Sequence, residues 1–213
     1  MKLTRFKQSC FLIEIAGKRI YIDPNGIPEG QNPADIILIT HSHSDHYEKS
    51  SVENIFSENT TLIAPKSCSE IIDTWNGRPI TPGEKFEIEG LSIEAVPAYN
   101  QGFIRRFLHN SKKHFCGYII SDGNSRIYHA GDTDLIPELK ELENIDVLFL
   151  PVGGFFTMNS EDAINLIKNI QPKKFIPMHE LRTDLEEFKQ NASKELPETE
   201  IIILRERDEC EIN

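Results

Sequence analysis

The fold is decided by residues 36–46, which read Ile36-Ile37-Leu38-Ile39-Thr40-His41-Ser42-His43-Ser44-Asp45-His46. The apolar start of this stretch predicts a buried strand over residues 36–40. Side chains two positions apart in extended backbone point the same way, so we expect His41 and His43 to converge on one metal ion, with Asp45 on the same side. If the chain then turns into a helix, His46 swings round to a neighbouring position. Imidazole and carboxylate groups bind Zn²⁺ in proteins, so the stretch favours a metal site over a polar loop with surface histidines.

Two further candidate ligands follow later strands. Asp132 comes after a strand predicted over residues 126–130 and after Gly131, which allows a sharp turn. Asp132 is placed to bridge two metal ions, and the alternative is an aspartate that caps a helix or a turn. His179 follows a strand predicted over residues 173–177, although a lone histidine is more often structural. Because strand ends that meet at one edge of an α/β sheet usually build its site, we interpret both as ligands.

The rest of the pattern predicts an α/β fold in which hairpins come first and strand–helix–strand units follow. Further short runs rich in β-branched residues predict strands over residues 10–15, 19–22, 61–64, 85–88, 91–96, 116–121, 146–150 and 200–204. Helices are expected over residues 47–56, 68–74, 135–142, 160–170 and 184–192. The segment 160–170 is the clearest, because its apolar residues form one stripe and Asn159 or Ser160 can cap it. Thr183 opens a capping box for the last helix.

Composition restricts the class of partner. The chain has 213 residues and a formal net charge of −11, which argues against general binding to nucleic acid or to anionic membranes. No apolar run approaches the roughly 18–20 residues that a membrane span needs, and the first residues lack the features of a signal peptide. We therefore expect a cytoplasmic protein. The four cysteines are scattered, which predicts reduced, partly buried thiols.

These motifs together resemble the metallo-β-lactamase superfamily. The resemblance rests on HxHxDH after an apolar strand, on Gly131-Asp132-Thr133 after another, and on the late His179. Residues 150–158, LPVGGFFTM, and residues 176–179, IPMH, further resemble the small predicted hydrolases related to ascorbate-6-phosphate lactonase. The resemblance covers essentially the whole chain. It implies a single domain over residues 1–213 with a four-layer αββα sandwich, in which helices flank two central mixed β-sheets.

The resemblance also implies a metal-dependent hydrolase of the lactonase, esterase or phosphodiesterase kind. His41 and His43 would bind the first metal ion. Asp45, His46 and His179 would bind the second, and Asp132 would bridge the two. A hydroxide held by the metal ions would cleave an ester, lactone, amide or phosphoester bond of a small, anionic metabolite. Asp45 and Asp132 are the catalytic candidates, with Asp45 orienting the nucleophile or taking its proton.

The expected cofactor is one or two divalent metal ions. Zinc is the first choice, with manganese or iron as alternatives, because geometry and availability decide the metal more than ligand type does. The expected partner is a small-molecule substrate. Relatives in this superfamily often assemble, so a homo-oligomer also stays open.

One position departs from the family pattern. The family usually supplies a third histidine to the first metal after the middle strands, where this chain has Asn100. An amide oxygen is a weaker zinc ligand than imidazole, so we expect Asn100 as a polar contact near the metal, with His109 or His114 as candidates to fill the gap. His129 precedes Asp132 by three residues and is interpreted as its supporting partner or a substrate contact, or else as a strand histidine with a local hydrogen bond.

Residues 100–117 form a basic stretch without any acidic residue. Arg105 and Arg106 lie in it among apolar side chains, which suits a lid that attracts a phosphate or carboxylate group. The alternatives are a solvated loop and a surface that packs against another subunit.

Three other functions compete with the small-molecule hydrolase. A phosphodiesterase or nuclease on the same fold is disfavoured by the acidic charge and by the short chain. In related di-iron oxidoreductases glutamate generally stands where this chain has His43. A non-catalytic binding module with an incomplete metal site is kept open by Asn100.

Overall fold

The computed structural model describes residues 1–101 and 109–212. Contacts between these residues group into two compact units. Unit 1 comprises Met1–Thr81 and Leu204–Asn213, and unit 2 comprises Pro82–Ile203. Each unit is built on one mixed β-sheet, for which the described residues give seven strands apiece. The expectation of two mixed sheets flanked by helices is thereby confirmed.

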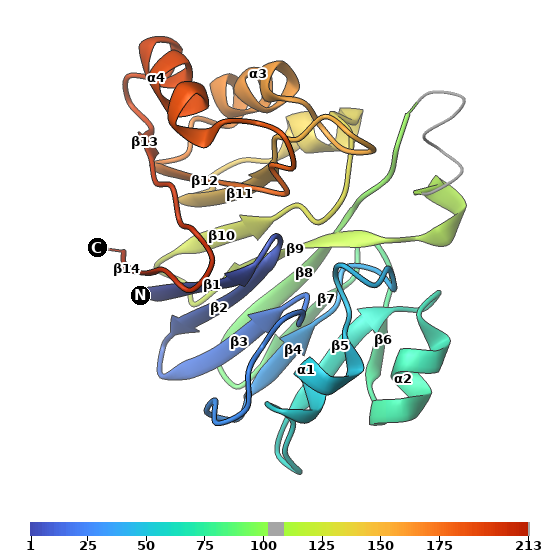
Figure 1. Ribbon diagram of the computed structural model, residues 1–213. Helices are drawn as coiled ribbons and strands as arrows, with labels where there is room; N and C mark the ends of the chain where they lie inside the picture. The colour runs from blue at the N-terminus through green and yellow to red at the C-terminus, as the bar shows by residue number, and fades with distance from the viewer. Residues whose placement is uncertain (102–108, 213) are drawn as a thin grey trace. The chain divides into compact units, whose positions relative to one another are not determined.

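Unit 1 has the strand order β14-β1-β2-β3-β4-β5-β6, drawn mostly in blue and cyan in Figure 1. Its strands are β1 (Lys2–Lys7), β2 (Cys10–Ile15), β3 (Lys18–Ile22), β4 (Ile36–Leu38), β5 (Thr61–Pro65), β6 (Arg78–Ile80) and β14 (Glu209–Glu211), and its helices are α1 (Lys49–Glu53) and α2 (Ser69–Trp75). Strands β3 to β6 run parallel, with Ile22 opposite Leu38. Because parallel strands end at the same edge, the residues after β3 and after β4 meet there.

The core of unit 1 explains why these strands form. Ile13, Ile20, Ile22, Ile36 and Leu38 are all fully buried. Burying an apolar side chain of this size stabilises the fold by about 1.5–3 kcal/mol relative to leaving it exposed. The edge that carries residues 41–46, the histidine loop, therefore rests on a closely packed apolar layer.

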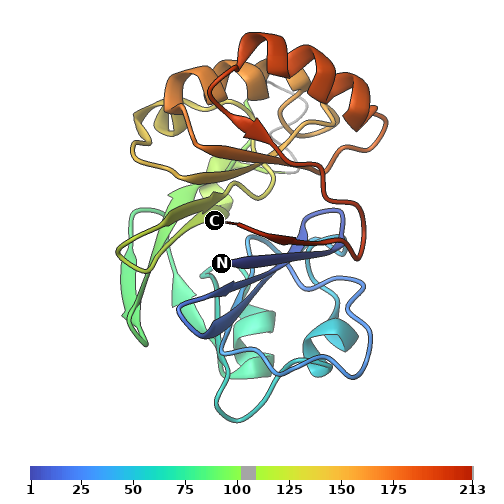
Figure 2. The same cartoon turned by 90° about the vertical axis from the view of Figure 1, so that its left-hand side faces the viewer.

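Unit 2 has the strand order β13-β12-β11-β10-β9-β8-β7. Its strands are β7 (Lys85–Ile88), β8 (Leu91–Pro97), β9 (Cys116–Ser121), β10 (Arg126–His129), β11 (Val147–Pro151), β12 (Lys174–Met178) and β13 (Glu200–Ile201), and its α-helices are α3 (Ser160–Ile170) and α4 (Leu185–Glu195). Helices α3 and α4 lie side by side over this sheet, in orange and red in Figure 2. Strands β10 to β13 are parallel, so Asp132 and His179 follow strands that end at one edge.

The predicted helix over residues 160–170 is confirmed with the same bounds as α3. Asn159, rather than Ser160, supplies the cap, since its side chain accepts a hydrogen bond from the backbone N–H of Asp162. In α4 the cap was expected at Thr183 and is instead Asp184, whose carboxylate accepts from the N–H groups of Glu186 and Glu187. A carboxylate at this position also interacts favourably with the helix dipole.

Several predicted elements differ in extent, among them the strand expected over residues 36–40, which ends at Leu38. The helix expected over residues 47–56 is limited to α1, because the preceding residues form a turn and Glu48 is extended. The helix expected over residues 135–142 is a 3₁₀ turn, Pro137–Glu141. The strand expected over residues 200–204 covers only Glu200–Ile201, since Leu204 already belongs to unit 1, where its carbonyl accepts a hydrogen bond from Arg5.

Strands β1, β6 and β14 were not predicted. The pattern of β1 is concealed by Arg5, a charged residue in its middle that is nevertheless 1% exposed. Its guanidinium donates to the carbonyl oxygens of Leu204 and Gln8, so burial does not leave the charge without hydrogen bonds. In the described residues all four cysteines are free thiols, three of them buried. Across residues 1–101 and 109–212, each helix is too short or too polar to cross a bilayer.

Candidate metal centre

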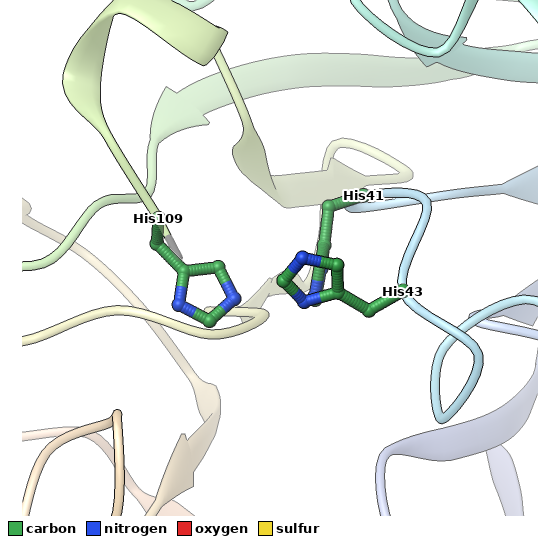
Figure 3. Close-up of side chains that lie close together, drawn as sticks. All are labelled: His41, His43 and His109. Atoms are coloured by element: carbon green, nitrogen blue, oxygen red, sulfur yellow. The ribbon is translucent and has the colours of Figure 1, made fainter. Parts of the chain in front are cut away.

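The histidine loop follows β4 in unit 1. His41 is buried and His43 is half-buried. Their ring centroids are 4.6 Å apart and their planes stand nearly perpendicular, and a nitrogen of one ring lies within 4.8 Å of a nitrogen of the other. Figure 3 shows both side chains on this loop. The structure thus brings together the pair that the alternation of the sequence predicted.

His46 reaches the same place through a turn rather than a helix. The carbonyl of His43 accepts hydrogen bonds from the N–H groups of His46 and Tyr47, at 3.0 and 2.9 Å. The side chain of Asn25 donates a hydrogen bond to the carbonyl of Ser44 at 2.6 Å and so stabilises the turn. As a result the rings of His41 and His46 have centroids 4.1 Å apart, and His46 is fully buried.

Asp23 stabilises this loop through hydrogen bonds to Thr40 and His46. It follows β3 and adopts a positive φ of 49°, a conformation that aspartate tolerates better than most residues. Its carboxylate accepts from the backbone N–H of Thr40 at 2.7 Å, from the Thr40 hydroxyl at 2.8 Å and from Nδ1 of His46 at 2.7 Å. Asp23 is completely buried, so these three hydrogen bonds replace those that water makes to an exposed carboxylate.

The same hydrogen bonds fix which nitrogen of each histidine carries the proton. His46 donates its Nδ1–H to the carboxylate of Asp23, which leaves the lone pair on Nε2. The Thr40 hydroxyl gives its only proton to Asp23 and lies 3.0 Å from Nδ1 of His41, so it must accept from that nitrogen. Histidines that bind a metal typically donate their other ring N–H in this way. Both rings therefore present Nε2 as a metal-binding atom.

Asp45 is partly exposed, unlike the buried His41 and His46. Its side chain is 44% exposed, and its Oδ2 lies 3.8 Å from Nε2 of the buried His46. A carboxylate oxygen next to an imidazole lone pair is a suitable pair of ligands for one divalent ion. The exposed part of Asp45 also remains accessible to a small molecule.

Unit 2 gathers two buried histidines around Asp132. Gly131 precedes it with a φ of +61° and turns the chain after β10. One carboxylate oxygen of Asp132, Oδ2, lies 3.3 Å from Nε2 of His179 and 3.6 Å from Nε2 of His109. All three side chains are buried to 94% or more. The structure thus places two imidazoles around one carboxylate within this unit.

His179 is held by a close approach between two backbones. Its φ is +48°, which is uncommon for a residue other than glycine and typical of functional sites. A Cβ atom at Gly153 would lie 2.4 Å from the carbonyl oxygen of His179, so only glycine fits there. The sequence between β11 and α3 therefore fixes the backbone of His179.

The residues expected near the substrate have different surroundings. Asn100 is buried and hydrogen bonded to His109. His129 is fully buried at the end of β10, and its Nδ1 accepts from the N–H of Gly131 at 3.3 Å, which shapes the turn before Asp132. Arg105 and Arg106 lie outside the described residues.

Sequence reasoning missed Asp23 and its partner Thr40. The available signal was an aspartate directly after a buried strand, in Ile22-Asp23-Pro24, which is the same placement that singled out Asp132. His109 was one of two candidates for the missing histidine. It is buried and faces Asp132, whereas His114 is exposed.

The donor set fits a divalent transition metal. Within unit 1 it offers the imidazoles of His41, His43 and His46 and the carboxylate of Asp45, and within unit 2 the carboxylate of Asp132 and the imidazoles of His109 and His179. Neutral imidazole with carboxylate suits zinc and the neighbouring first-row metals. The fixed Nδ1–H tautomers of His41 and His46 support the same interpretation, because they direct a lone pair away from the supporting carboxylate.

Comparisons with known proteins agree on a family. A family model described as a beta-lactamase superfamily domain matches residues 2–179. A UPF0173 metal-dependent hydrolase of Thermococcus onnurineus is 33% identical over 212 residues, covering 90% of this chain and 92% of that protein. A relative with the same description from Nanoarchaeum equitans is 32% identical over 226 residues and covers 100% of both chains.

A solved structure shares the fold. It is Igni18, described as a novel metallo hydrolase from the hyperthermophilic archaeon Ignicoccus hospitalis, and it matches with a TM-score of 0.81 at 26% identity, covering 100% of this chain and 99% of that one. With the histidine loop, the Asp132 turn and His179 in the order that the resemblance requires, the chain belongs to the metallo-β-lactamase superfamily and, within it, to the UPF0173 metal-dependent hydrolases.

Proposed function

We propose that this protein is a metal-dependent hydrolase that cleaves an ester, lactone or phosphoester bond of a small, anionic metabolite. The observation that carries the proposal is the Asp23 carboxylate, which accepts from His46 and, through Thr40, orients His41. Buried polar groups arranged in this way stabilise imidazoles as ligands. The descriptions of the UPF0173 relatives as metal-dependent hydrolases support the same reaction class.

In this proposal the ligands divide between two ions. His41 and His43 would hold the first, Asp45, His46 and His179 would hold the second, and Asp132 would contribute its carboxylate to both. Zinc is the expected metal. A bound divalent ion lowers the pKa of a coordinated water toward about 7 and polarises the oxygen of the scissile bond.

The protein's own residues supply orientation and proton transfer. Asp23 keeps the Nδ1 protons of His46 and, through Thr40, of His41 in place, so the ligand atoms do not have to reorient during turnover. Asp45 carries an exposed carboxylate, which orients the attacking water and takes its proton. Asp132 is buried between His109 and His179 and would supply negative charge to hold the metal ions.

The substrate class is supported by a pocket in unit 2. A cavity of about 490 Å³ is lined by Gly153, Gly154, Phe155, Leu181 and Arg182. Phe155 and Leu181 are 64% and 51% exposed, so they give the pocket an apolar surface that a ligand can reach. Leu181 and Arg182 lie two and three residues after His179 along the chain. The apolar residues suit an acyl or aryl group, and Arg182 suits a carboxylate or phosphate.

Metal content tests the proposal first. Untagged protein purified without chelator is analysed by plasma mass spectrometry and then assayed on an aryl ester, a lactone and an aryl phosphodiester. About two ions per chain and hydrolysis of the ester or lactone are expected. Preference for the phosphodiester would shift the function to a phosphodiesterase. Metal-free protein without activity, also after incubation with Zn²⁺ or Mn²⁺, would leave a non-catalytic binding module.

Arg182 tests the substrate class. Arg182→Ala is expected to raise KM for a substrate with a carboxylate about tenfold, in line with the loss of a charged hydrogen bond, and to leave a neutral ester unchanged. Arg78→Ala, an exposed arginine of unit 1, is the matched control. An equal effect of Arg182→Ala on both substrates would contradict an anion contact.

A further inference from the structure

Asn100 and His109 form a buried pair in unit 2. Nδ1 of His109 lies 2.6 Å from the side-chain oxygen of Asn100, and the two residues are 2% and 4% exposed. The amide nitrogen of Asn100 donates to the carboxylate of Asp134 at 3.1 Å and to the carbonyl of Phe156 at 2.8 Å. Every polar atom of the Asn100 side chain therefore has a defined direction.

These contacts determine the tautomer of His109. Two acceptors, the Asp134 carboxylate and the Phe156 carbonyl, face the amide nitrogen, so the amide cannot be turned round without setting oxygen against oxygen. The Asn100 oxygen thus faces His109 and can only accept. His109 must donate from Nδ1, and in the neutral ring its Nε2 then carries a lone pair.

The lone pair on Nε2 of His109 faces another acceptor, the carboxylate of Asp132. Nε2 of His109 lies 3.6 Å from Oδ2 of Asp132, which is longer than a hydrogen bond. An imidazole lone pair and a carboxylate oxygen at this distance repel one another, and a metal ion between them relieves the repulsion. The separation suits two ligand atoms that each stand about 2.0–2.2 Å from one ion. His179 approaches the same oxygen at 3.3 Å. His109 and the predicted ligand His179 therefore both direct Nε2 toward the same oxygen of Asp132.

The backbone of unit 2 builds this arrangement. The N–H of Asn100 donates to the carbonyl of His109 at 2.8 Å, which joins the two ends of the intervening segment. The N–H of Gln101 donates to the carboxylate of Asp134 at 2.8 Å, and the N–H of Asp134 donates to the carbonyl of Tyr99 at 3.1 Å. The loop of Asn100 is thus tied to the loop of Asp132. Figure 3 labels His109, which lies on the segment that leads to β9.

We propose that His109 is a metal ligand that takes the place of the third histidine of the family pattern. Asn100 is then the positioning residue that fixes the tautomer and ring orientation of His109. The inference rests on the proposed metal-dependent function. It assigns Asn100 a role behind the ligand instead of contact with the ion. It also means that the site does not have to be completed by water at this position.

Cobalt(II) titration tests the proposal without relying on activity. Co²⁺ replaces zinc in such sites, and the visible absorption of the bound ion reports its ligands. His109→Ala is expected to lose one tightly bound ion, or to bind it at least about tenfold more weakly, with a changed spectrum. His114→Ala removes an exposed histidine five residues away and is the matched control, expected to titrate like the wild type. Circular dichroism of each variant confirms that it folds.

Two further variants separate positioning from folding. Asn100→Ala is expected to lower the affinity for the same ion about 10–100-fold, the range found for residues that support a ligand. The double variant Asn100→His with His109→Ala moves an imidazole to position 100, and it is expected to recover binding and the absorption of a nitrogen-rich site. Loss in His109→Ala with recovery in the double variant supports ligation, because a folding defect would not be repaired in this way.

The outcomes distinguish this inference from the function on which it rests. A wild-type protein that binds no Co²⁺ overturns the proposed function and the inference together. Wild-type binding that remains unchanged in affinity, stoichiometry and spectrum in His109→Ala overturns the inference alone. Wild-type behaviour of Asn100→Ala together with a defective His109→Ala overturns the positioning role of Asn100 and retains His109 as a ligand.

Discussion

Asp23 accepts a hydrogen bond from Nδ1 of His46 at 2.7 Å, and neither side chain is exposed to solvent. Asp23→Asn keeps the size of the side chain but replaces one acceptor oxygen with a donor, which opposes the His46 N–H or the donors of Thr40. We expect metal affinity to fall about 10–100-fold. We also expect the free energy of unfolding to fall by about 1–3 kcal/mol, because buried donors lose their acceptor.

Asp35→Asn separates these two effects. Asp35 is a partly buried carboxylate of the same unit that accepts from the N–H of Arg19 at 2.8 Å. Its replacement is expected to lower stability in urea unfolding and to leave Zn²⁺ affinity, measured by calorimetric titration, as in the wild type. Equal affinities for Asp23→Asn and wild type would show that Asp23 supports the fold without supporting the ligands.

Asp132→Ala is expected to abolish hydrolysis and to remove one or both metal ions while the fold remains. The reason is that Asp132 Oδ2 stands between the imidazoles of His109 and His179, so its removal takes away the negative charge that two ions would share. Metal content and circular dichroism are measured on the same sample. Asp122→Ala, in the turn between β9 and β10, serves as the control. A fully active, metal-replete Asp132→Ala protein would rule out bridging.

Gly153→Ala is expected to impair metal binding through His179. The added Cβ would lie 2.4 Å from the His179 carbonyl oxygen, a backbone atom that must then move and carry the ligand with it. Gly123→Ala is a suitable comparison, because Gly123 has a positive φ of 87° and open space around it. It should lower the thermal midpoint without changing metal content. Identical metal content in the two variants would argue that His179 is not held by this contact.

Arg105 and Arg106 test the lid that the basic stretch predicts. Replacing both with alanine is expected to raise KM for an anionic substrate several-fold, because Arg–anion hydrogen bonds are lost, and to leave neutral esters unaffected. The steady-state constants for one anionic and one neutral ester of the same acyl group provide the measurement. If both substrates respond alike, the stretch does not select for charge.

Glu48 makes the free energy of unfolding depend on pH. Its carboxylate accepts hydrogen bonds from the Ser51 hydroxyl and the Gly26 N–H, and these lower its pKa from the ordinary value. A lowered folded-state pKa contributes stability that is present above the unfolded pKa of about 4.3 and is lost as pH falls through the folded value. The stability difference between wild type and Glu48→Gln should therefore shrink below about pH 4.3. Urea unfolding between pH 7 and pH 3 measures it.

Ser51→Ala provides the internal check for Glu48. It removes the larger cause of the lowered pKa, so the acid-dependent part of the difference should become smaller. A stability difference between wild type and Glu48→Gln that is constant over the whole pH range would contradict the assignment.

Local patterns made most of the fold predictable. The strands Cys10–Ile15, Lys85–Ile88 and Cys116–Ser121 and the helix Ser160–Ile170 have the predicted bounds, because each carries its apolar period and its stop signals within itself. Strand β1 was missed because Arg5 is satisfied by the distant carbonyl of Leu204. That partner is invisible to any pattern read along a short window.

Distance along the chain also decided which residues of the site could be predicted. The candidate ligands in residues 41–46 are close in sequence and were predicted together, and Asp132 and His179 were predicted because they follow strands. Asp23 reaches His46 only through the parallel pairing of β3 with β4, in which Ile22 lies opposite Leu38. The choice between His109 and His114 depended on a hydrogen bond between the backbones of residues 100 and 109, which residue types do not reveal.

The pairing of β1 with β14 has a consequence for how the chain can be rearranged. Lys2 lies opposite Glu211, and the backbones of Met1 and Ile212 exchange hydrogen bonds, so a short linker can join the two termini. Opening such a circular chain between Thr81 and Pro82 would make unit 1 continuous in sequence, since its two segments would become neighbours. In the natural order, the sheet of unit 1 is completed only after unit 2 has been synthesised, because β14 follows unit 2 in the sequence, whereas the permuted chain would allow each unit to be synthesised without interruption.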